Sequence, residues 1–439
     1  VPPNSGEMLD TVDISQVLVG NVESIEIIQG GASAIYGANA MGGVVNIITQ
    51  NPNKAFSFSA DLSAGGWGAK SNEKTIPKSS AILSASSRIG NLATQISANL
   101  VDQNGYDTDD TEPGTDGWHG FKNNYSGKIQ YFSNQGNTLT FSPSFYRAET
   151  ATYKISQNIN KTIYESMVTR KRDTMDLSYQ GVFNSVSYNL HAMAQSYEEH
   201  IDNNADDLEQ ESKNRAFDVS LSKHFSYDHL VTLLVESQYE YLNQYNISKQ
   251  KYEVENKDKR ATDISLSDLW LTGDGFEVTA AVRANNDEMY GTHVSPMLST
   301  KFSNDNWFSG EFNLRASIAD GYKKPSLKHL YWDFDHSSSR YFGSIDLQPE
   351  TSLNTQIGFE FLSNSNSRYE VNLFKNDINN LIGTKLNPVR ASELGISAVY
   401  EYTNIKKAKT QGLDLSYSKS FDSFTLNLGY SFLDAINQA

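Results

Sequence analysis

The sequence predicts an all-β protein, specifically a transmembrane antiparallel β-barrel. Three observations support this prediction: apolar residues recur at every second position from residue 56 onward, short and long polar connections alternate between these segments, and aromatic residues gather near the expected strand ends. A period of two is typical of a strand with one apolar and one polar face. A membrane barrel has tight turns on one rim, long loops on the other and aromatic belts at both interfaces.

The alternation of apolar and polar residues locates the strands. It starts at Phe56, Phe58 and Leu62 and ends at Tyr430 and Phe432. The connections are rich in Asn, Asp, Ser and Gly, and they range from the short "KSFDSF" to the long "NGYDTDDTEPGTDGWHGFKN". Strands are therefore expected at 56–64, 92–100, 186–194, 231–241, 276–282, 312–318, 357–361, 369–373, 413–417 and 424–432.

Charge, cysteine content and hydropathy narrow the function classes. The chain has 439 residues, a formal net charge of -16 and a pI near 5.0, so it lacks the basic surface expected of a nucleic-acid-binding protein. The absence of cysteine excludes disulfide frameworks, thiolate zinc sites and cysteine nucleophiles. No run of about 18 apolar residues occurs, so a transmembrane helix is not expected. The mean hydropathy of -0.51 fits alternating barrel strands.

The stretch "IEIIQGGASAIYGANAMGGVVNIITQ" (25–50) places glycines and alanines between two β-branched runs. A phosphate-binding P-loop would need Lys and Ser or Thr after its last glycine, but Gly43 is followed by two valines. A dinucleotide fingerprint is also absent, because Gly30 and Gly31 are adjacent and a strand-like run follows Gly43. We therefore expect two strands, 22–28 and 44–49, joined by a compact segment of small residues that allows close backbone approach.

This stretch resembles the end of the plug domain of TonB-dependent outer-membrane receptors. The resemblance implies a globular plug inside a wide barrel of the type with about 22 strands. Residues 1–52 would be the C-terminal part of the plug, and residues 53–439 a barrel that is incomplete here. Gln29 stands where the family usually has an arginine, which weakens any charge-based locking of plug to wall at that point. The matching plug residues are Glu26, Gly30, Ser33, Tyr36, Gly37, Gly42, Gly43 and Asn46.

Later segments resemble barrel motifs of the same family. The first is "DGYKKPSLKHLY" (320–331), the second "GSIDLQPETS" (343–352), where Ser344 and Ile345 replace the usual Asn-Pro, and the third "YTNIKKAKTQGLDLSYS" (402–418). The three motifs occur in the order that the family has. Their matching residues are Tyr322, Pro325, Leu347, Pro349, Glu350 and Gly412.

The resemblance implies a receptor in the outer membrane of a Gram-negative bacterium. Such a receptor binds a scarce iron-siderophore or cobalamin and imports it with energy transmitted by TonB, although the TonB-contacting segment and the last barrel strands would lie outside this sequence. The implied partners are TonB, the ligand and outer-membrane lipid, and the implied state is a monomer that requires no cofactor. An enzyme is not expected, because no paired carboxylates or Ser/His/Asp set occurs at a recognisable spacing.

Two other functions remain open from the sequence. A haem receptor of the same family would place a ligand histidine between the first two barrel motifs, where His329 and His336 lie. A soluble carbohydrate-binding or adhesive β protein would account for the aromatic and acidic residues, but not for the plug-like stretch.

Two acidic segments of the sequence suggest a calcium-binding site. Calcium binds six to eight oxygen ligands, which clustered carboxylates on facing loops can supply. The spacing is not that of an EF-hand, because Glu112 occupies the glycine position when Asp107 is taken first. The candidate ligands are Asp102, Asp107, Asp109, Asp110 and Asp116 in one segment, and Asp202, Asp206, Asp207, Glu209 and Glu211 in the other.

Overall fold

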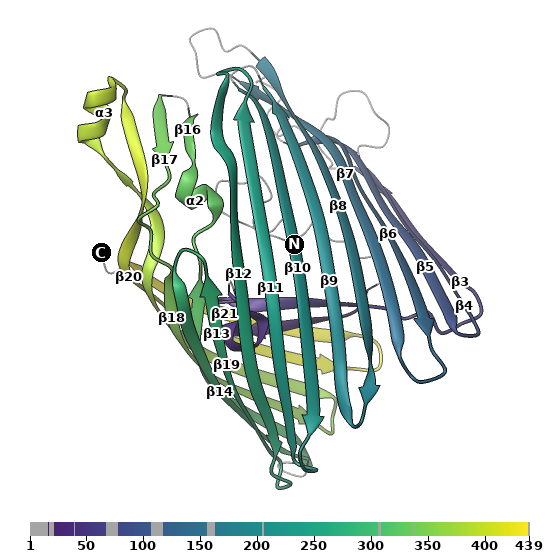
Figure 1. Cartoon of the computed structure of the whole chain (residues 1–439). Coiled ribbons are helices and arrows are strands. Elements are labelled where there is room, and N and C mark those ends of the chain that lie inside the picture. Colours follow the sequence, from purple (N-terminus) through teal and green to yellow (C-terminus); the bar gives the residue numbers. More distant parts are fainter. Residues whose placement is uncertain are drawn as a thin grey trace.

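The computed structural model describes residues 16, 22–38, 40–66, 78–106, 117–155, 163–203, 206–305, 309–336 and 338–437. Within these residues, no helix is both long and apolar enough to span a membrane. Long antiparallel strands dominate the molecule and wrap around an interior that holds the N-terminal elements (Figure 1).

The barrel sheet runs through the chain from residue 57 to residue 437. Its strands are β3 (Ser57–Gly65), β4 (Lys78–Ile89), β5 (Leu92–Asn104), β6 (His119–Phe132), β7 (Thr138–Ile155), β8 (Ile163–Phe183), β9 (Val186–Asp202), β10 (Asp207–His224), β11 (His229–Asn246), β12 (Lys251–Leu271), β13 (Phe276–Asp287), β14 (Gly291–Asn304), β15 (Gly310–Lys323), β18 (Glu350–Ser363), β19 (Ser367–Leu386), β20 (Ala398–Ser420) and β21 (Thr425–Asn437).

Consecutive strands pair antiparallel with their neighbours, except that β15 pairs directly with β18. The segment between them forms α2 (Leu327–Tyr331) and a hairpin of β16 (Asp333–His336) and β17 (Ser339–Phe342), and β17 pairs parallel to β20. A further helix, α3 (Pro388–Leu394), lies between β19 and β20. These elements stand at the long-loop end of the barrel beside β12 and β20 (Figure 1).

The opposite rim is made of tight turns. Asn184 and Ser185, between β8 and β9, have φ angles of 47° and 62°, and positive φ at both central residues is what a two-residue hairpin turn with the right twist requires. Short turns on one rim and long connections on the other confirm the predicted asymmetry.

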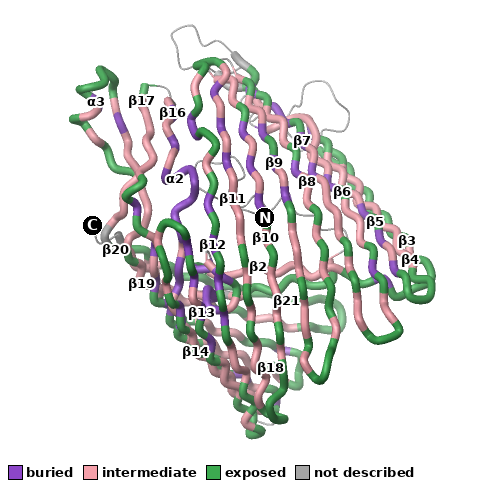
Figure 2. The backbone as a smooth tube through the Cα atoms, in the orientation of Figure 1, coloured by how far each residue is buried: buried purple, intermediate pink, exposed green. Residues whose placement is uncertain are grey.

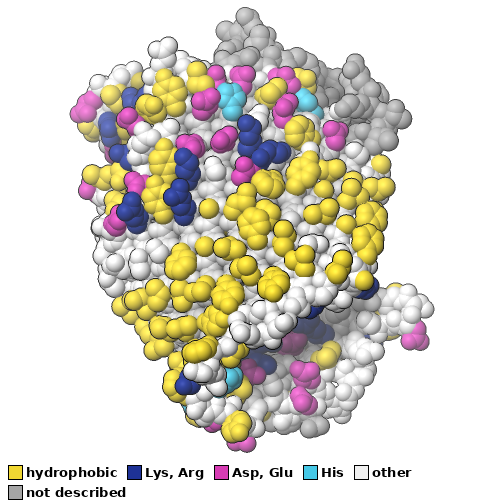
Figure 3. Space-filling view, turned by 45° about the vertical axis from the view of Figure 1, so that its right-hand side comes forward, with side chains coloured by type: hydrophobic (Ala, Val, Ile, Leu, Met, Phe, Trp, Pro, Cys, Tyr) yellow, Lys and Arg dark blue, Asp and Glu magenta, His cyan; other side chains and the backbone are white. Residues whose placement is uncertain are grey.

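The alternating side chains are arranged in the opposite sense to those of a soluble β-protein, because the apolar face of each strand points outward. On β10, Phe217 and Leu221 are exposed, whereas Gln210, Ser212 and Asn214 are buried. Figure 2 shows this pattern of exposed and buried residues across the wall, and Figure 3 shows a broad band of hydrophobic side chains on the outside. Apolar side chains outside and polar ones inside are the signature of a barrel in lipid, so the predicted fold class is confirmed.

The N-terminal elements form a small unit in the interior. β1 (Val22–Gln29) pairs antiparallel with β2 (Gly43–Thr49), and α1 (Ser33–Tyr36) lies between them. The two expected strands are thus present, with the small-residue segment as their connection. α1 contacts β12, β13, β14 and β15, and Figure 1 shows this unit lying across the barrel toward the tight-turn end.

Candidate functional site

The connection between β1 and β2 is held against the barrel wall by hydrogen bonds. The Oγ atom of Ser265 on β12 donates to the carbonyl of Ala34 over 2.7 Å. The backbone amide of Tyr322 on β15 donates to the Oγ of Ser33 over 3.2 Å. Ser33 and Ala34 are fully buried, so the α1 segment fits tightly against two wall strands.

Two glycines permit this close approach. A Cβ placed on Gly31 would lie 2.4 Å from Nδ2 of Asn354, and one placed on Gly37 would lie 2.9 Å from Nη2 of Arg283. Gly37 also has a φ of 90°, which L side chains rarely adopt. The wall therefore explains why the sequence has small residues here: any side chain at these positions would displace a wall residue.

Arg283 belongs to a buried charge cluster on the wall. Its Nη2 donates to Asp263 over 2.7 Å and to Glu236 over 2.5 Å, and its Nε donates to Asp263 over 3.1 Å. Arg283 is 1% exposed. Among the described residues this cluster joins β11, β12 and β13 of the wall, and the plug backbone at Gly37 rests against it.

The remaining plug-motif residues have different environments. Asn46 donates to Glu26 over 2.9 Å across the β1–β2 pair, so these two motif residues stabilise the hairpin together. Gly30 and Gly43 have positive φ, Tyr36 is exposed, and a Cβ on Gly42 would meet no atom within 4 Å. The side chain of Gln29 lies outside the described residues. Gly30, Gly31 and Gly42 line a cavity of about 250 Å³ together with residues of β15, β18, β19 and β20.

The first barrel motif meets the plug motif directly. Tyr322 is 2% exposed, and its ring stacks on His293 with centroids 4.4 Å apart, while its backbone holds Ser33. The carbonyl of Pro325 accepts a hydrogen bond from Lys259 over 3.1 Å.

The other two barrel motifs have structural roles. Leu347 is buried, and the carbonyl of Pro349 accepts from Asn380 over 3.5 Å. Glu350, also buried, accepts from the amide of Ile382 on β19 over 2.7 Å. A Cβ on Gly412 would lie 2.5 Å from the ring of Phe374. These residues fix the joints between β18, β19 and β20.

His329, a predicted haem ligand, caps α2. Its backbone amide donates to Ser326 Oγ over 3.2 Å, and its Nδ1 accepts from the amide of Ser326 over 3.3 Å. The residue is 8% exposed and its ring lies against Tyr402. One ring nitrogen thus serves the helix cap. His336 lies on β16, and its side chain lies outside the described residues.

The predicted calcium ligands are only partly described. Asp107, Asp109, Asp110 and Asp116 lie outside the described residues, and Asp102 lies on β5. In the second segment, Asp206 pairs with Lys249 over 2.6 Å and Glu211 pairs with Lys213 over 2.6 Å, whereas Asp207 and Glu209 face His200. In the described part of the chain, no group of three or more His, Asp or Glu is arranged to hold a metal ion. Calcium binding stays a prediction.

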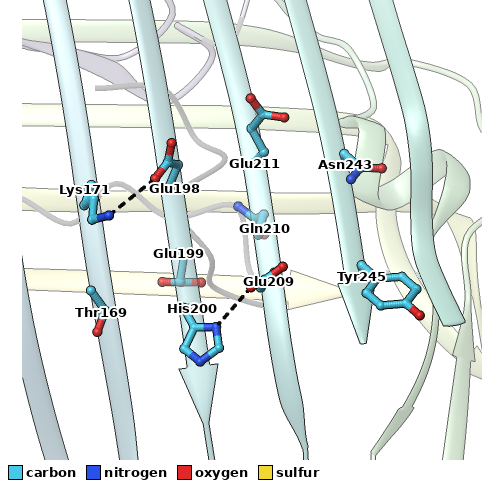
Figure 4. A pocket seen from close by; sticks show the side chains of 10 residues that line it. All are labelled: Thr169, Lys171, Glu198, Glu199, His200, Glu209, Gln210, Glu211, Asn243 and Tyr245. Atoms are coloured by element: carbon cyan, nitrogen blue, oxygen red, sulfur yellow. Dashed lines mark ion pairs between the residues drawn. The ribbon is translucent and has the colours of Figure 1, made fainter. Parts of the chain in front are cut away.

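Figure 4 shows where part of this second segment lies. Lys171, Glu198, His200, Glu209, Asn243 and Tyr245 line a hollow of about 420 Å³ that is formed by β8–β11. Their strand positions have the same parity as the exposed Leu177, Leu190, Phe217 and Leu233, so these six side chains belong to the outer face of the wall.

The long-loop end carries an aromatic stack. Trp332 stacks on Phe334 with centroids 4.0 Å apart, Phe334 on Tyr341 at 4.9 Å, and Tyr341 on Tyr400 at 4.9 Å. The stack joins α2, the β16–β17 hairpin and β20. Together with Leu242 and Val254 it forms a small hydrophobic core at this end of the barrel.

Cations surround this aromatic stack. Arg340 donates to Asp333 through two nitrogens, at 2.7 and 2.9 Å, and Lys251 pairs with the same carboxylate over 2.8 Å. The guanidinium carbons of Arg340 and Arg390 lie 4.8 and 3.6 Å from the ring centre of Phe342. We call Arg340, Phe342 and Arg390 the mouth cluster. Sequence reasoning missed it, because short strands inside a loop carry no clear periodicity.

The charges of the hairpin reinforce one another. Burial acts to raise the pKa of Asp333, but hydrogen bonds from Arg340 and Lys251 outweigh it and hold the pKa below its usual value of 3.8. The hydrogen bond from Arg340 to Asp333 in turn raises the pKa of the Arg340 guanidinium. Both groups therefore stay charged, and the hairpin remains tied to β12.

Comparison with known proteins assigns this architecture to a family. Residues 79–439 match the family described as "TonB dependent receptor-like, beta-barrel", and residues 3–44 match the TonB-dependent receptor plug domain. The iron-regulated outer membrane virulence proteins of two Vibrio cholerae serotype O1 strains are each 24% identical to the chain, and the match covers 94% of it. The chain spans 62% of the length of these relatives.

Solved structures have the same fold. The siderophore receptor PirA from Pseudomonas aeruginosa superposes with a TM-score of 0.76 at 19% identity, over 95% of this chain and 73% of that one. PirA from Acinetobacter baumannii gives 0.78 at 18% identity, over 96% and 68%. A mutant ferric enterobactin receptor, PfeA from Pseudomonas aeruginosa, in complex with enterobactin gives 0.77 at 19%, over 96% and 69%. The chain belongs to the TonB-dependent receptor family of outer-membrane proteins of Gram-negative bacteria.

Proposed function

We propose that the chain is the barrel and part of the plug of a receptor that binds an iron-siderophore at the outer surface and imports it with energy transmitted by TonB. The observation that carries this proposal is the α1 segment, which is held in the barrel interior by hydrogen bonds to Ser265 and Tyr322. A wide barrel with an element fixed across its lumen is a plugged transporter and not an open pore. Such a plug has to move before a ligand can pass.

The contacts at the junction suit a plug that moves. Among the described residues near α1, the buried charges of Arg283, Asp263 and Glu236 pair with one another on the wall. Displacing α1 breaks neutral hydrogen bonds, each of about 1 kcal/mol, whereas moving the rest of the plug also breaks the hydrogen bonds that the wall cations Arg172 and Lys128 donate to Gln16 and Thr49. A junction of this kind is stable at rest and still yields to applied force.

The mouth cluster suits an anionic aromatic ligand. The guanidinium groups of Arg340 and Arg390 both lie against the ring of Phe342. Arg340 also pairs with Asp333, and Arg390 pairs with Glu401. Guanidinium groups bind anionic oxygens in pairs and stack on aromatic rings. A ferric catecholate is both anionic and aromatic, so we propose this class of siderophore as the ligand.

The relatives support the same class of cargo. The Vibrio cholerae proteins carry names that describe iron regulation, and the structural neighbours carry names that describe siderophore or ferric enterobactin receptors. Membership of this receptor family leaves no support for the soluble carbohydrate-binding or adhesive alternative. No catalytic role is proposed.

A binding measurement tests this proposal. The purified receptor is titrated with a ferric catecholate, cobalamin and haemin, and quenching of tryptophan fluorescence is recorded. We expect saturable binding of the ferric catecholate, weakened by Arg340→Gln with Arg390→Gln, while Arg88→Gln at the tight-turn rim leaves it unchanged. Tighter binding of cobalamin or haemin would contradict the proposed ligand class.

A further inference from the structure

The outer wall carries a row of three cross-strand neighbours with an unusual composition. Arg215 on β10 is paired with Tyr239 on β11, which is paired in turn with Arg260 on β12. The two guanidinium carbons lie 5.8 and 5.7 Å from the centre of the Tyr239 ring. We call these three residues the Arg–Tyr–Arg row. The ring fixes both guanidinium groups close together on one surface.

The row lies directly above the lipid-facing band. Phe217 lies two residues closer to the tight-turn rim than Arg215. The triplet Val219, Val235 and Ile264 lies four residues closer to that rim than the Arg–Tyr–Arg row. Phe217 and Ile264 are 52% and 51% exposed. At the rise of a β-strand, the triplet is about 13 Å along the wall from the row. The row therefore lies at the height where lipid headgroups meet the outer end of the apolar band.

The two arginines lie among outer-face residues of both charges. Lys213, the next outward-facing cation above Arg215 on β10, pairs with Glu211 over 2.6 Å. Asp258 lies one outward-facing position above Arg260, and Glu288, whose amide donates to the carbonyl of Arg260 over 3.4 Å, lies across from it. Neither carboxylate forms an ion pair with Arg260 in the described residues. Both arginines are exposed, and within the described residues neither has an ion-pair partner. Figure 3 shows Lys and Arg side chains, together with Asp and Glu side chains, above the hydrophobic band of the outside.

We propose that the Arg–Tyr–Arg row binds the phosphate group of an anionic lipid headgroup in the outer leaflet. Guanidinium donors pair with two phosphate oxygens at once, which a lysine cannot do. The outward-facing apolar triplet below the row would hold the acyl chains of the same lipid, and Tyr239 would rest at the headgroup level as interfacial tyrosines do. The surface is outside the barrel, so this site is separate from the ligand path.

Lipid binding to the purified receptor tests the proposal. The receptor is extracted from outer membranes, stripped of lipid in detergent, and titrated with bis-phosphorylated lipid A, and bound lipid is counted by native mass spectrometry. We expect Arg215→Gln with Arg260→Gln to weaken binding roughly 10- to 30-fold. A lipid A analogue without phosphate should bind the unchanged receptor as weakly as the double variant binds lipid A.

Matched variants separate this site from general surface charge. Arg88→Gln with Lys223→Gln removes the same charge from two other cation–aromatic pairs of the wall, at the tight-turn rim, and should leave binding unchanged. Arg215→Lys with Arg260→Lys keeps the charge and should lose part of the affinity. Equal binding by the Arg215→Gln/Arg260→Gln variant, equal loss in the Arg88→Gln/Lys223→Gln control, or equal binding of the phosphate-free lipid would each overturn the proposal.

Discussion

At the residue scale, the junction between plug and wall depends on the absence of side chains on one side and on buried charge on the other. Gly37 and Gly31 leave room for Arg283 and Asn354. The sequence identified Ser33 and Gly37 through their motif, but not their wall partners. Ser265 is 231 positions from Ala34 and Tyr322 is 289 positions from Ser33, and strand alternation tells which residues face inward without telling which of them meet.

The Gly37→Ala variant tests the fit. We expect the free energy needed to detach its plug segment from the wall to fall by about 1–3 kcal/mol, because φ is positive at this position and the new methyl group meets buried Arg283. Protease cleavage of the 22–49 segment in folded barrels measures this effect. Gly42→Ala is the matched control, since a Cβ there meets no atom within 4 Å. Equal cleavage of the two variants would contradict the close fit.

The Arg283→Met variant tests the charge cluster. Removing the guanidinium leaves two carboxylates, Asp263 and Glu236, without their cation in the interior, at a cost of about 3–5 kcal/mol. We expect a lower temperature for the loss of the compact barrel band in electrophoresis. Adding Asp263→Asn and Glu236→Gln should restore much of the loss, and failure of this rescue would show that packing and not charge dominates.

At the element scale, periodicity predicted most barrel strands but not their full lengths, because the outward face above the lipid band is polar and the alternation ends there. β19, for example, is expected at 369–373 and spans Ser367–Leu386. The direct pairing of β15 with β18 could not be predicted either. The hairpin between them is held by Asp333, Arg340 and Lys251, and such tertiary contacts have no sequence period.

The hairpin should respond to acid. The pKa of Asp333 is lower in the folded state than its usual 3.8, so its contribution to stability is complete above that value and is lost as the pH falls through the lowered value. Fluorescence of Trp332, which is buried in the stack, should be constant from neutral pH to about pH 4 and change below it. The Asp333→Asn variant should show the changed signal already at neutral pH. An unchanged acid transition in this variant would assign the transition to another group.

At the scale of the whole molecule, the barrel has charged residues inside, an apolar surface outside and a plug segment fixed to its wall. Its fold class was readable from the sequence because lipid imposes a simple rule on every outward position. The boundary between plug and barrel at residue 52 stays a prediction, as does the monomeric state. So does calcium, since most of the first acidic segment lies outside the described residues.

The calcium prediction belongs to this scale, because it concerns loops from different parts of the chain. Added Ca²⁺ should slow protease cleavage within 102–116 and 202–211, and Asp107→Asn with Asp109→Asn should abolish the effect. Asp258→Asn on the outer wall is the control. No protection at about millimolar Ca²⁺ would end the prediction.

Import by living cells tests the central claim most directly. Cells that carry this receptor as their only siderophore receptor are given a ferric catecholate labelled with radioactive iron, with TonB present or deleted. The account expects label to accumulate inside cells only when TonB is present, and to remain surface-bound when TonB is deleted. Equal accumulation without TonB, or no binding in either strain, would contradict the account.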